Sequence, residues 1–379
     1  MTTVLLTLGR LPKALELARA LRAVGCRVLV AEPFARHLTG ASRAVARSFV
    51  VPAPAFDRAG YLRSLADIVA KESVDLVLPV SEEILHVASL QERLPGSVRV
   101  AAMPLTSLLS VYDKQAFITR CLEAGLAAPQ TRPLDHPSAA ELMQIGPTVI
   151  KPRHSCSGRG VQFLARGAAV PVCDEPAIVQ SFVPGQLLST FGFARHGCLY
   201  STVVYRAAVL QGTVAVCFER IDATPAVLEW IARFVAHTGF DGFISFDLML
   251  DAQGAVWGIE CNPRTTSGIH FVHPEDLARS VLRPDDPQPW RFKPGRLRQQ
   301  FYPCLTETQA SMFTGRFRDN LRNLWHARDV SWQLYDPWPF VGMPWLSWPI
   351  IERAMKDRCT FGEVAMRDLD WRETAENRT

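Results

Sequence analysis

The first hundred residues alternate between short apolar runs and longer segments whose apolar positions recur at helical spacing. Runs with the length of a buried strand occur at 3–9, 26–32, 74–80 and 98–102. Helical spacing marks residues 11–25, residues 57–72 and a segment from Ser81. Apolar strands separated by amphipathic helices are typical of parallel βαβ units, so we predict a parallel α/β domain. No GxGxxG motif follows Gly9, which favours a structural domain over a dinucleotide site.

The pattern changes at about residue 106, where helices are followed by segments typical of antiparallel strands. One predicted helix, 112–125, has Asp113 near its start, and another, 224–239, has Thr224 as its cap. Strands are predicted within 147–164, 176–185, 187–194 and 198–209. Residues 242–251 and 255–262 predict two more strands around a turn at 251–254. The middle of the chain is therefore predicted to be α+β.

The last hundred residues are rich in tryptophan and proline. Seven of the nine tryptophans lie there, and residues 336–355 read DPWPFVGMPWLSWPIIERAM. Because proline interrupts regular structure, we predict a loop packed by aromatic rings, with a short helix after it. Aromatic packing that docks this segment on the main body is the favoured interpretation, and a membrane-surface or acyl-binding element is the alternative.

Composition places the chain among globular proteins. Apolar residues make up 48% of its 379 residues and charged residues 21%, which suits two or three well-packed domains. The net charge of +4 comes from 41 basic and 37 acidic residues without a basic block, so nucleic acid is not expected as a partner.

The cysteines and the apolar runs bear on the compartment. Nine scattered cysteines without a CxxC pair favour reduced thiols in a cytoplasmic protein over a disulfide framework or a zinc site. The N-terminal apolar run is short and favours a first strand over a signal peptide. No run approaches the roughly 18 apolar residues that a membrane span needs.

Two acids on neighbouring predicted strands suggest a metal site. Asp247 lies four residues before the predicted turn and Glu260 six after it, so the two side chains are expected to face each other. Like charges at that range destabilise a sheet unless a cation lies between them. Carboxylate oxygens with the Asn262 carbonyl suit Mg²⁺. The alternative is structural, with Glu260 in salt bridges to Arg264 and Lys151.

A loop of small residues, HSCSGRG at 154–160, follows Lys151. Small residues let backbone N–H groups approach an anion, and Lys151 adds positive charge at the base of the loop. No GK[ST] follows, and the next element is a predicted strand, so the loop is not a P-loop. Taken alone, the loop favours an ordinary hairpin turn.

The order of these motifs resembles the ATP-grasp superfamily. Lys114 in DKQAF, Lys151 in VIKP, the SGRG loop, VQSFVPG, FDLML and IECNPR follow one another over about 150 residues. The ExNPR form is most similar to the carbamoyl-phosphate-synthetase-like branch, and the resemblance covers roughly residues 1–275. It implies a pre-ATP-grasp α/β domain at 1–105 and a small lobe with glycine loop and hinge at 106–183. A large lobe with the metal site follows at 184–278, and a Trp-rich extension at 279–379.

The resemblance also implies roles for individual residues. Lys114 and Lys151 match the phosphate-binding lysines, and Arg264 matches the arginine that steadies the γ-phosphate and an acyl-phosphate. The glycine loop corresponds to Ser155, Ser157, Gly158 and Gly160, the adenine hinge to Gln180, Ser181 and Val183, and the metal triad to Asp247, Glu260 and Asn262. The sequence departs from the family at Leu187, where an acid near the ribose is usual, and at Gln180, where Glu is frequent. These departures leave the ribose contacts open.

The activity implied by the resemblance is an ATP-dependent carboxylate–amine ligase that forms an acyl-phosphate and releases ADP and phosphate. The cofactors would be ATP and two Mg²⁺ ions, with Mn²⁺ as a substitute. The partners would be a small carboxylate and an amine, and the resemblance leaves a homo-oligomer open. Alternatives are carboxyphosphate or carbamoyl-phosphate chemistry and a nucleotide-binding regulatory module without turnover. The sequence does not identify the acid or the amine.

Overall fold

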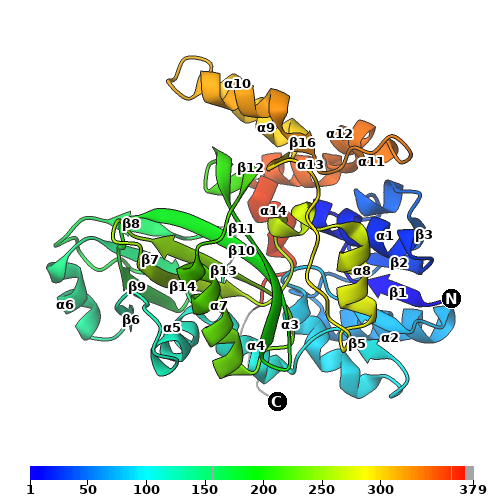
Figure 1. The fold of residues 1–379 in the computed structure, drawn as a ribbon, viewed down its shortest axis with the longest axis horizontal. Coiled ribbons are helices and arrows are strands. Elements are labelled where there is room, and N and C mark those ends of the chain that lie inside the picture. The colour runs from blue at the N-terminus through cyan, green and yellow to red at the C-terminus, as the bar shows by residue number, and fades with distance from the viewer. Residues whose placement is uncertain (156–157, 360, 372–379) are drawn as a thin grey trace.

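Three β-sheets organise the chain. The computed structural model describes residues 1–155, 158–359 and 361–371. A five-stranded sheet lies at one side of the molecule, a four-stranded sheet at the other, and a seven-stranded sheet between them (Figure 1). The predicted mixture of a parallel α/β unit and antiparallel α+β units is confirmed.

The N-terminal sheet is parallel, with strand order β3-β2-β1-β4-β5. Its strands are β1 (Thr3–Leu6), β2 (Arg27–Glu32), β3 (Val45–Val50), β4 (Leu76–Leu78) and β5 (Arg99–Val100). Its helices are α1 (Pro12–Ala23), η1 (Thr39–Ala41), α2 (Arg58–Glu72), α3 (Ile84–Val87) and η2 (Ala88–Arg93). The predicted strands and the helices at α1 and α2 are confirmed. The patterning missed β3, because this edge strand is mostly exposed and lacks an apolar run.

The four-stranded sheet and its helices follow. The helices are α4 (Leu105–Tyr112), α5 (Lys114–Glu123) and α6 (Ser138–Ile145), and the strands are β6 (Thr131–Pro133), β7 (Thr148–Pro152), β8 (Gln162–Leu164) and β9 (Ala177–Ser181). The sheet is antiparallel, in the order β6-β9-β7-β8. Asp113 caps α5 by accepting a hydrogen bond from the Ala116 N–H at 2.9 Å, as its position in the sequence predicted.

The seven-stranded sheet has the order β14-β13-β10-β11-β12-β15-β16. Its strands are β10 (Gln186–Arg195), β11 (Cys198–Gln211), β12 (Val214–Ile221), β13 (Gly242–Leu250), β14 (Val256–Asn262), β15 (Leu297–Gln299) and β16 (Arg328–Asp329). Helix α7 (Pro225–Thr238) has Thr224 as its cap and ends at Gly239, whose φ of 60° lies in the left-handed region. One hydrophobic cluster joins this sheet to the N-terminal sheet, because Phe191 and Trp290 belong to the same core as Val4 and Leu6.

The C-terminal part is helical. Its elements are η3 (Ser267–Phe271), α8 (Pro274–Leu282), α9 (Phe301–Ala310), α10 (Phe317–His326), α11 (Trp338–Val341), α12 (Met343–Leu346), α13 (Trp348–Asp357) and α14 (Phe361–Arg367). The loop predicted for the start of the Trp/Pro-rich segment was wrong, since residues 338–346 form two single-turn helices, but the short helix predicted after it is confirmed as α13. Proline falls in the first turn of α11, α12 and α13, where its missing N–H costs nothing. No helix in these described ranges has both the length and the apolar character that a bilayer crossing needs.

Buried ion pairs dock this C-terminal part on the N-terminal sheet. Asp336 lies 2.9 Å from Arg19 of α1, and both side chains are at most 4% exposed. Asp368 lies 2.7 Å from Arg10, which also pairs with Glu32. Burial and the two neighbouring acids act in opposite directions on Arg10, and its pKa is raised above its usual value. Docking therefore depends on charge pairing as well as on aromatic contacts.

We expect Asp336→Asn to lower the free energy of unfolding by roughly 3–5 kcal/mol, because Arg19 would remain buried without a counter-ion. Urea unfolding followed by tryptophan fluorescence measures this loss. The control is Glu123→Gln, which breaks the exposed 3.0 Å pair with Arg120 and should cost at most about 1 kcal/mol. Equal, small losses in both variants would contradict a docking role for Arg19–Asp336.

Candidate functional site

A cleft of about 880 Å³ lies where the seven-stranded sheet meets the N-terminal sheet and the C-terminal helices. Strands β10, β11, β13 and β14 supply one wall, and Leu11 and Lys13 at the start of α1 supply part of another. Residues of α10 and α14, among them Arg322 and Met366, complete the lining. The C-terminal extension is therefore part of the wall of the cleft.

Asp247 and Glu260 face each other in this cleft. Their Cα atoms are partners in the β13–β14 hairpin, as the count of residues from the turn predicted. A bulge places Ile259 between the pairs Leu248–Gly258 and Asp247–Glu260, so the extra residue brings Glu260 opposite Asp247. Ser189 of β10 donates a hydrogen bond to Asp247 at 2.7 Å. The bulge is thus the local device that assembles the acid pair.

The two acids have opposite pKa shifts. Burial and the nearby charge of Glu260 raise the pKa of Asp247 to about 7. Burial also disfavours the ionised form of Glu260, but Lys114 and Lys151 outweigh it and hold the pKa of Glu260 below its usual value. Near neutral pH Glu260 is therefore ionised and Asp247 is only partly ionised.

Lys114 and Lys151 approach this pair from the small lobe. Lys114 opens helix α5, and its Nζ lies 3.6 Å from Glu260 and 2.7 Å from the Ser155 carbonyl oxygen. Lys151 is on β7 and donates to the Gln180 side chain at 2.9 Å. Burial, opposed by Glu260, lowers the pKa of Lys151 to about 8. The structural alternative, salt bridges from Glu260 to Arg264 and Lys151, is not what the described residues show, because Glu260 pairs with Lys114 and Arg264 pairs with Glu82.

The glycine loop is held by the C-terminal tail. Gly158 and Gly160 both have a φ of 71°, in the left-handed region that glycine favours. Between them Arg159 lies 2.8 Å from Asp370. Ser155 is buried beside Lys114, whereas Ser157 lies outside the described residues. The loop and the tail therefore share one ion pair.

The predicted hinge lies at the end of β9. The Gln180 side chain bridges Lys151 and Thr131, and the Ser181 N–H donates to the Gln130 carbonyl at 2.8 Å. An adenine edge at Ser181 would therefore contact its carbonyl oxygen. In the described part of the chain, the Val183 N–H has no backbone partner. Leu187, which stands where an acid is usual, is half exposed and lines the cleft.

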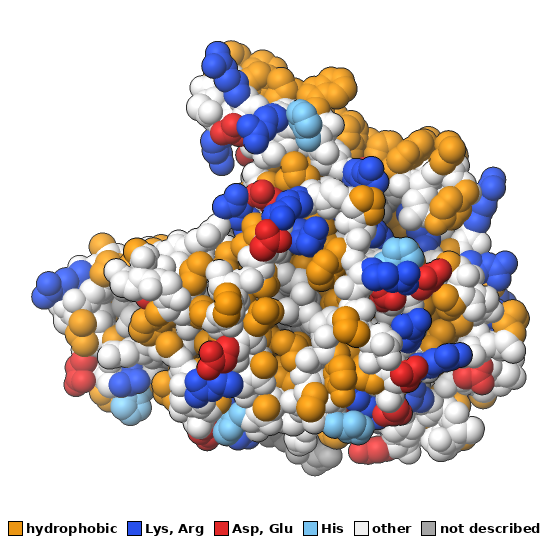
Figure 2. Space-filling view, in the orientation of Figure 1, with side chains coloured by type: hydrophobic (Ala, Val, Ile, Leu, Met, Phe, Trp, Pro, Cys, Tyr) orange, Lys and Arg blue, Asp and Glu red, His pale blue; other side chains and the backbone are white. Residues whose placement is uncertain are grey.

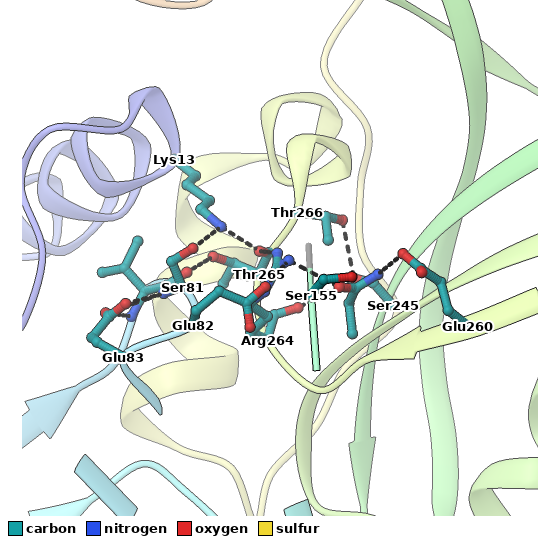
Figure 3. Close-up of polar contacts among 12 residues, drawn as sticks. Lys13, Ser81, Glu82, Glu83, Ser155, Ser245, Glu260, Arg264, Thr265 and Thr266 are labelled. Carbon is teal, nitrogen blue, oxygen red and sulfur yellow. Dashed lines mark hydrogen bonds and ion pairs between the residues drawn. The ribbon is translucent and has the colours of Figure 1, made fainter. Parts of the chain in front are cut away.

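Arg264 lies at the opposite end of the acid pair and is held from two sides (Figure 3). Its Nε donates to Glu82 at 2.8 Å, and an Nη atom donates to the Asn262 side-chain oxygen at 2.9 Å. Glu82 is 1% exposed, and burial is outweighed by Arg264 and Lys13, which hold the pKa of Glu82 below its usual value. The guanidinium is thereby fixed at the wall of the cleft.

Three polar residues of the N-terminal domain were missed from the sequence. Lys13 is buried and donates to Ser81 Oγ and to the Thr265 carbonyl, both at 2.9 Å (Figure 3). Ser81 and Glu82 follow β4, and β4 neighbours β1, where the strand order changes direction. Ligands of open α/β sheets bind at such a position, so the SEE motif after an apolar strand was the available signal.

The donor set can be tested against a metal ion. Among the described residues, no group of three or more His, Cys, Asp or Glu side chains gathers that could hold one. The cleft offers two facing carboxylates and the Asn262 amide, which are hard oxygen donors of the kind that Mg²⁺ prefers. These residues fit Mg²⁺.

Solved structures share this fold. No family model matches the chain, and no curated protein matches its sequence. An L-amino acid ligase from Bacillus licheniformis has a TM-score of 0.60 at 16% identity, over 75% of this chain and 74% of that one. An N5-carboxyaminoimidazole synthetase from Staphylococcus aureus has 0.60 at 12%, over 77% and 80%. A biotin carboxylase from Campylobacter jejuni, in a complex with β,γ-ATP, has 0.58 at 13%, over 74% and 70%.

Together the sheet topology and these neighbours define the class: the chain has the ATP-grasp fold. The resemblance drawn from the DKQAF-to-IECNPR order is confirmed at the level of the fold. At 12–16% identity the neighbours define the architecture alone, so the chemistry of this chain is argued from its own cleft.

We expect Glu82→Gln to destabilise the protein by roughly 3–5 kcal/mol, since it removes the charge of the buried carboxylate that pairs with Arg264. Adding Arg264→Met should restore part of this loss, because removing both partners leaves no uncompensated charge. Urea unfolding of the two single variants and the double variant completes the cycle. Additive losses would show that Glu82 and Arg264 do not interact energetically.

Proposed function

We propose that this chain is an ATP-dependent ligase that joins a carboxylate to an amine and releases ADP and phosphate. One observation carries the proposal. A single cleft of an ATP-grasp fold holds two lysines, Lys114 and Lys151, a facing acid pair, Asp247 and Glu260, and the fixed Arg264. A structural role alone would not require two half-buried carboxylates to face each other across paired strands.

The lysines and the hinge are proposed to bind ATP. Lys114 and Lys151 come from different elements of the small lobe and both reach Glu260 by charge interaction. Ammonium groups at this position neutralise phosphate oxygens whose charge grows as the γ-phosphoryl group leaves ADP. The backbone at Ser181 and Val183 is proposed to receive the adenine edge, beside Gln180.

Asp247, Glu260 and Asn262 would hold Mg²⁺ in the proposed function. When bound, Mg²⁺ would supply positive charge to the transferred phosphoryl group. The protein prepares this site by placing both carboxylates on paired strands and by fixing Asn262 through Arg264.

Arg264 and Lys13 are proposed to receive the acid substrate. A carboxylate oxygen of the substrate attacks the γ-phosphorus, giving an acyl-phosphate and ADP. The amine then attacks the acyl carbon, loses a proton and displaces phosphate. Glu82 holds the Arg264 guanidinium in one orientation at the cleft wall. A fixed positive charge therefore lies where the substrate carboxylate and the acyl-phosphate are proposed to bind.

The lining of the cleft supports an organic acceptor. Beyond the acid pair, the cleft is bounded by apolar side chains from three parts of the chain, Leu11, Leu297 and Met366. The C-terminal extension also contributes the polar side chains of Arg322 and Asn323. We infer that the cleft accepts a partly apolar substrate. The scattered cysteines without a CxxC pair support a cytoplasmic site of action.

A second candidate is carboxyphosphate chemistry on bicarbonate. It is favoured by the neighbours, since one is a biotin carboxylase and another an N5-carboxyaminoimidazole synthetase by name. If ATP hydrolysis required bicarbonate and no other acid or amine, carboxyphosphate chemistry would be favoured over the ligase reaction. A regulatory module without turnover is disfavoured because it would not need both buried acids.

The products test the reaction type. With pairs of carboxylates and amines screened for nucleotide release, we expect ADP and phosphate in equal amounts, formed only when acid and amine are both present. Formation of AMP and pyrophosphate would reject the acyl-phosphate route.

Glu260→Gln tests the acid pair without changing its shape. We expect turnover to fall by at least about a thousandfold, because a charge that organises phosphoryl transfer is lost. The rise in melting temperature that Mg²⁺-ATP causes in the wild type should shrink. Glu229→Gln, on the exposed face of α7, is the control and should behave like the wild type. A Glu260→Gln protein that is stabilised normally by Mg²⁺-ATP would contradict the metal assignment.

A further inference from the structure

The C-terminal extension carries large apolar side chains that face solvent. Phe313 is 97% exposed, Leu334 85% and Trp325 80%, and Trp338 and Trp345 are more than half exposed. Across the described part of the chain, all five exposed tryptophans lie between residues 325 and 348. We call the exposed apolar side chains of residues 312–348 the aromatic crest. Exposed apolar residues gathered in this way mark an interaction surface.

The crest occupies one edge of the molecule. Helices α10, α11 and α12 lie along the same upper edge, and α9 and α10 project beyond the body (Figure 1). The space-filling view shows hydrophobic side chains at the tip of this projection and again over the neighbouring helices (Figure 2). Basic side chains flank the projecting tip in the same view. The projecting tip stands clear of the body, so its side chains can reach into a lipid layer while the body stays in water.

A second layer of rings holds the crest in place. Phe340 packs against Phe301, Tyr302 and Trp332, with ring centroids 5.4–5.6 Å apart. The Arg36 guanidinium lies 4.7 Å from the Trp345 ring centroid. Together with the buried Arg19–Asp336 pair, these contacts fix the backbone beneath the crest. The outer rings are thus exposed on an anchored scaffold.

The charge of the segment around the crest is positive. Between residues 312 and 358, seven exposed basic side chains outnumber three exposed acidic ones. The basic ones are Arg316, Arg318, Arg322, Arg328, Arg353, Lys356 and Arg358, and the acidic ones Asp319, Glu352 and Asp357. Arg353 pairs with Asp357, Lys356 with Glu352 and Arg316 with Glu307, so Arg318, Arg322, Arg328 and Arg358 carry the excess of positive charge. The other two acids of the segment are occupied, Asp336 by Arg19 and Asp329 by three hydrogen bonds from residues 331 and 332.

We propose that the aromatic crest is a docking surface for an anionic lipid bilayer. Tryptophan is enriched at membrane–water interfaces because its ring is apolar and its N–H is polar. Arginine and lysine beside such rings are attracted to the negative surface of an anionic leaflet. The protein would lie on the bilayer, with Phe313, Leu334 and Trp325 at the depth of the head groups and the basic side chains on the phosphates.

A second copy of the chain is the less suitable occupant. A two-fold dimer would place the crest against itself, because such an interface uses the same patch on both subunits. The two positive segments would then face each other, and like charges across an interface oppose association. Anionic lipid supplies negative charge that complements the basic side chains, and a fluid bilayer can adapt to a projecting surface.

Vesicle flotation with the full chain tests the proposal. We expect partition onto vesicles of phosphatidylcholine with phosphatidylglycerol to exceed partition onto phosphatidylcholine alone by about tenfold or more, and to weaken as salt rises. The tryptophan emission should shift to shorter wavelength on the anionic vesicles. Equal partition onto both kinds of vesicle, or none onto the anionic kind, would overturn the proposal.

Two matched pairs of variants assign the contact to the crest. Phe313→Ser/Trp325→Ser/Trp338→Ser should reduce partition about tenfold or more, because each change removes an exposed apolar side chain. Leu122→Ser/Ile145→Ser/Val172→Ser removes three exposed apolar side chains elsewhere and should leave partition unchanged. Arg318→Gln/Arg328→Gln should weaken binding to anionic vesicles, and Arg63→Gln/Lys71→Gln on α2 should not.

Folding of the variants and dimer formation are measured separately. Circular dichroism and thermal melting of each variant establish that it is folded, since all substituted side chains are exposed. Partition that survives the crest triple variant would overturn the proposal. Light scattering that shows a dimer which the same variant dissociates, without vesicle binding by the wild type, would assign the crest to a second copy and reject the lipid. The lipid assay uses no ATP, so it is independent of the ligase activity.

Discussion

Two carboxylates that face each other on the paired strands β13 and β14 constrain much of the surrounding structure. Asp247 and Glu260 would repel each other if both were ionised, and neither is well solvated. Lys114 and Lys151 offset the charge of Glu260, while Asp247 keeps a raised pKa. Lys114 and Lys151 come from α5 and from the four-stranded sheet, and the acids come from the seven-stranded sheet, so this balance depends on how these parts pack together. The arrangement of acids and lysines in the cleft therefore follows from the need to balance the charge of Glu260.

Arg264 extends the same constraint to the N-terminal domain. Arg264 follows Asn262 by two residues, yet Glu260 pairs with Lys114 and not with Arg264. Instead Glu82 of the N-terminal domain holds Arg264, across 182 positions of sequence, and Asn262 accepts from the same guanidinium. Arg264 is therefore held in place by Glu82 and Asn262 without an ion pair to Glu260. In the proposed function, this separation of roles leaves the acid pair for Mg²⁺ and the guanidinium for the anionic substrate.

Sequence patterning predicted the parts of the fold whose signals are local. The hairpin around 251–254 was predicted from strand length and turn residues, and the facing of Asp247 and Glu260 followed from the count. The bulge at Ile259 that completes their register has no comparable signal, because it depends on pairing with the neighbouring strand. Likewise Glu82 and Lys13 reach the site only through the packing of separate domains. The helices at 338–346 were missed because proline was taken as a breaker, whereas at the first turn it favours a helix.

The C-terminal extension links these elements by means that composition alone does not reveal. Its tryptophans suggested a packed tail, yet the docking contacts in its interior include the acids Asp336, Asp368 and Asp370, which pair with Arg19, Arg10 and Arg159. Those three arginines belong to the N-terminal helix, the loop after β1 and the glycine loop. With acids fixing the segment from below, its outer aromatic rings are not needed to hold it in place. That division explains how the extension can form part of the cleft wall and still present the aromatic crest to solvent.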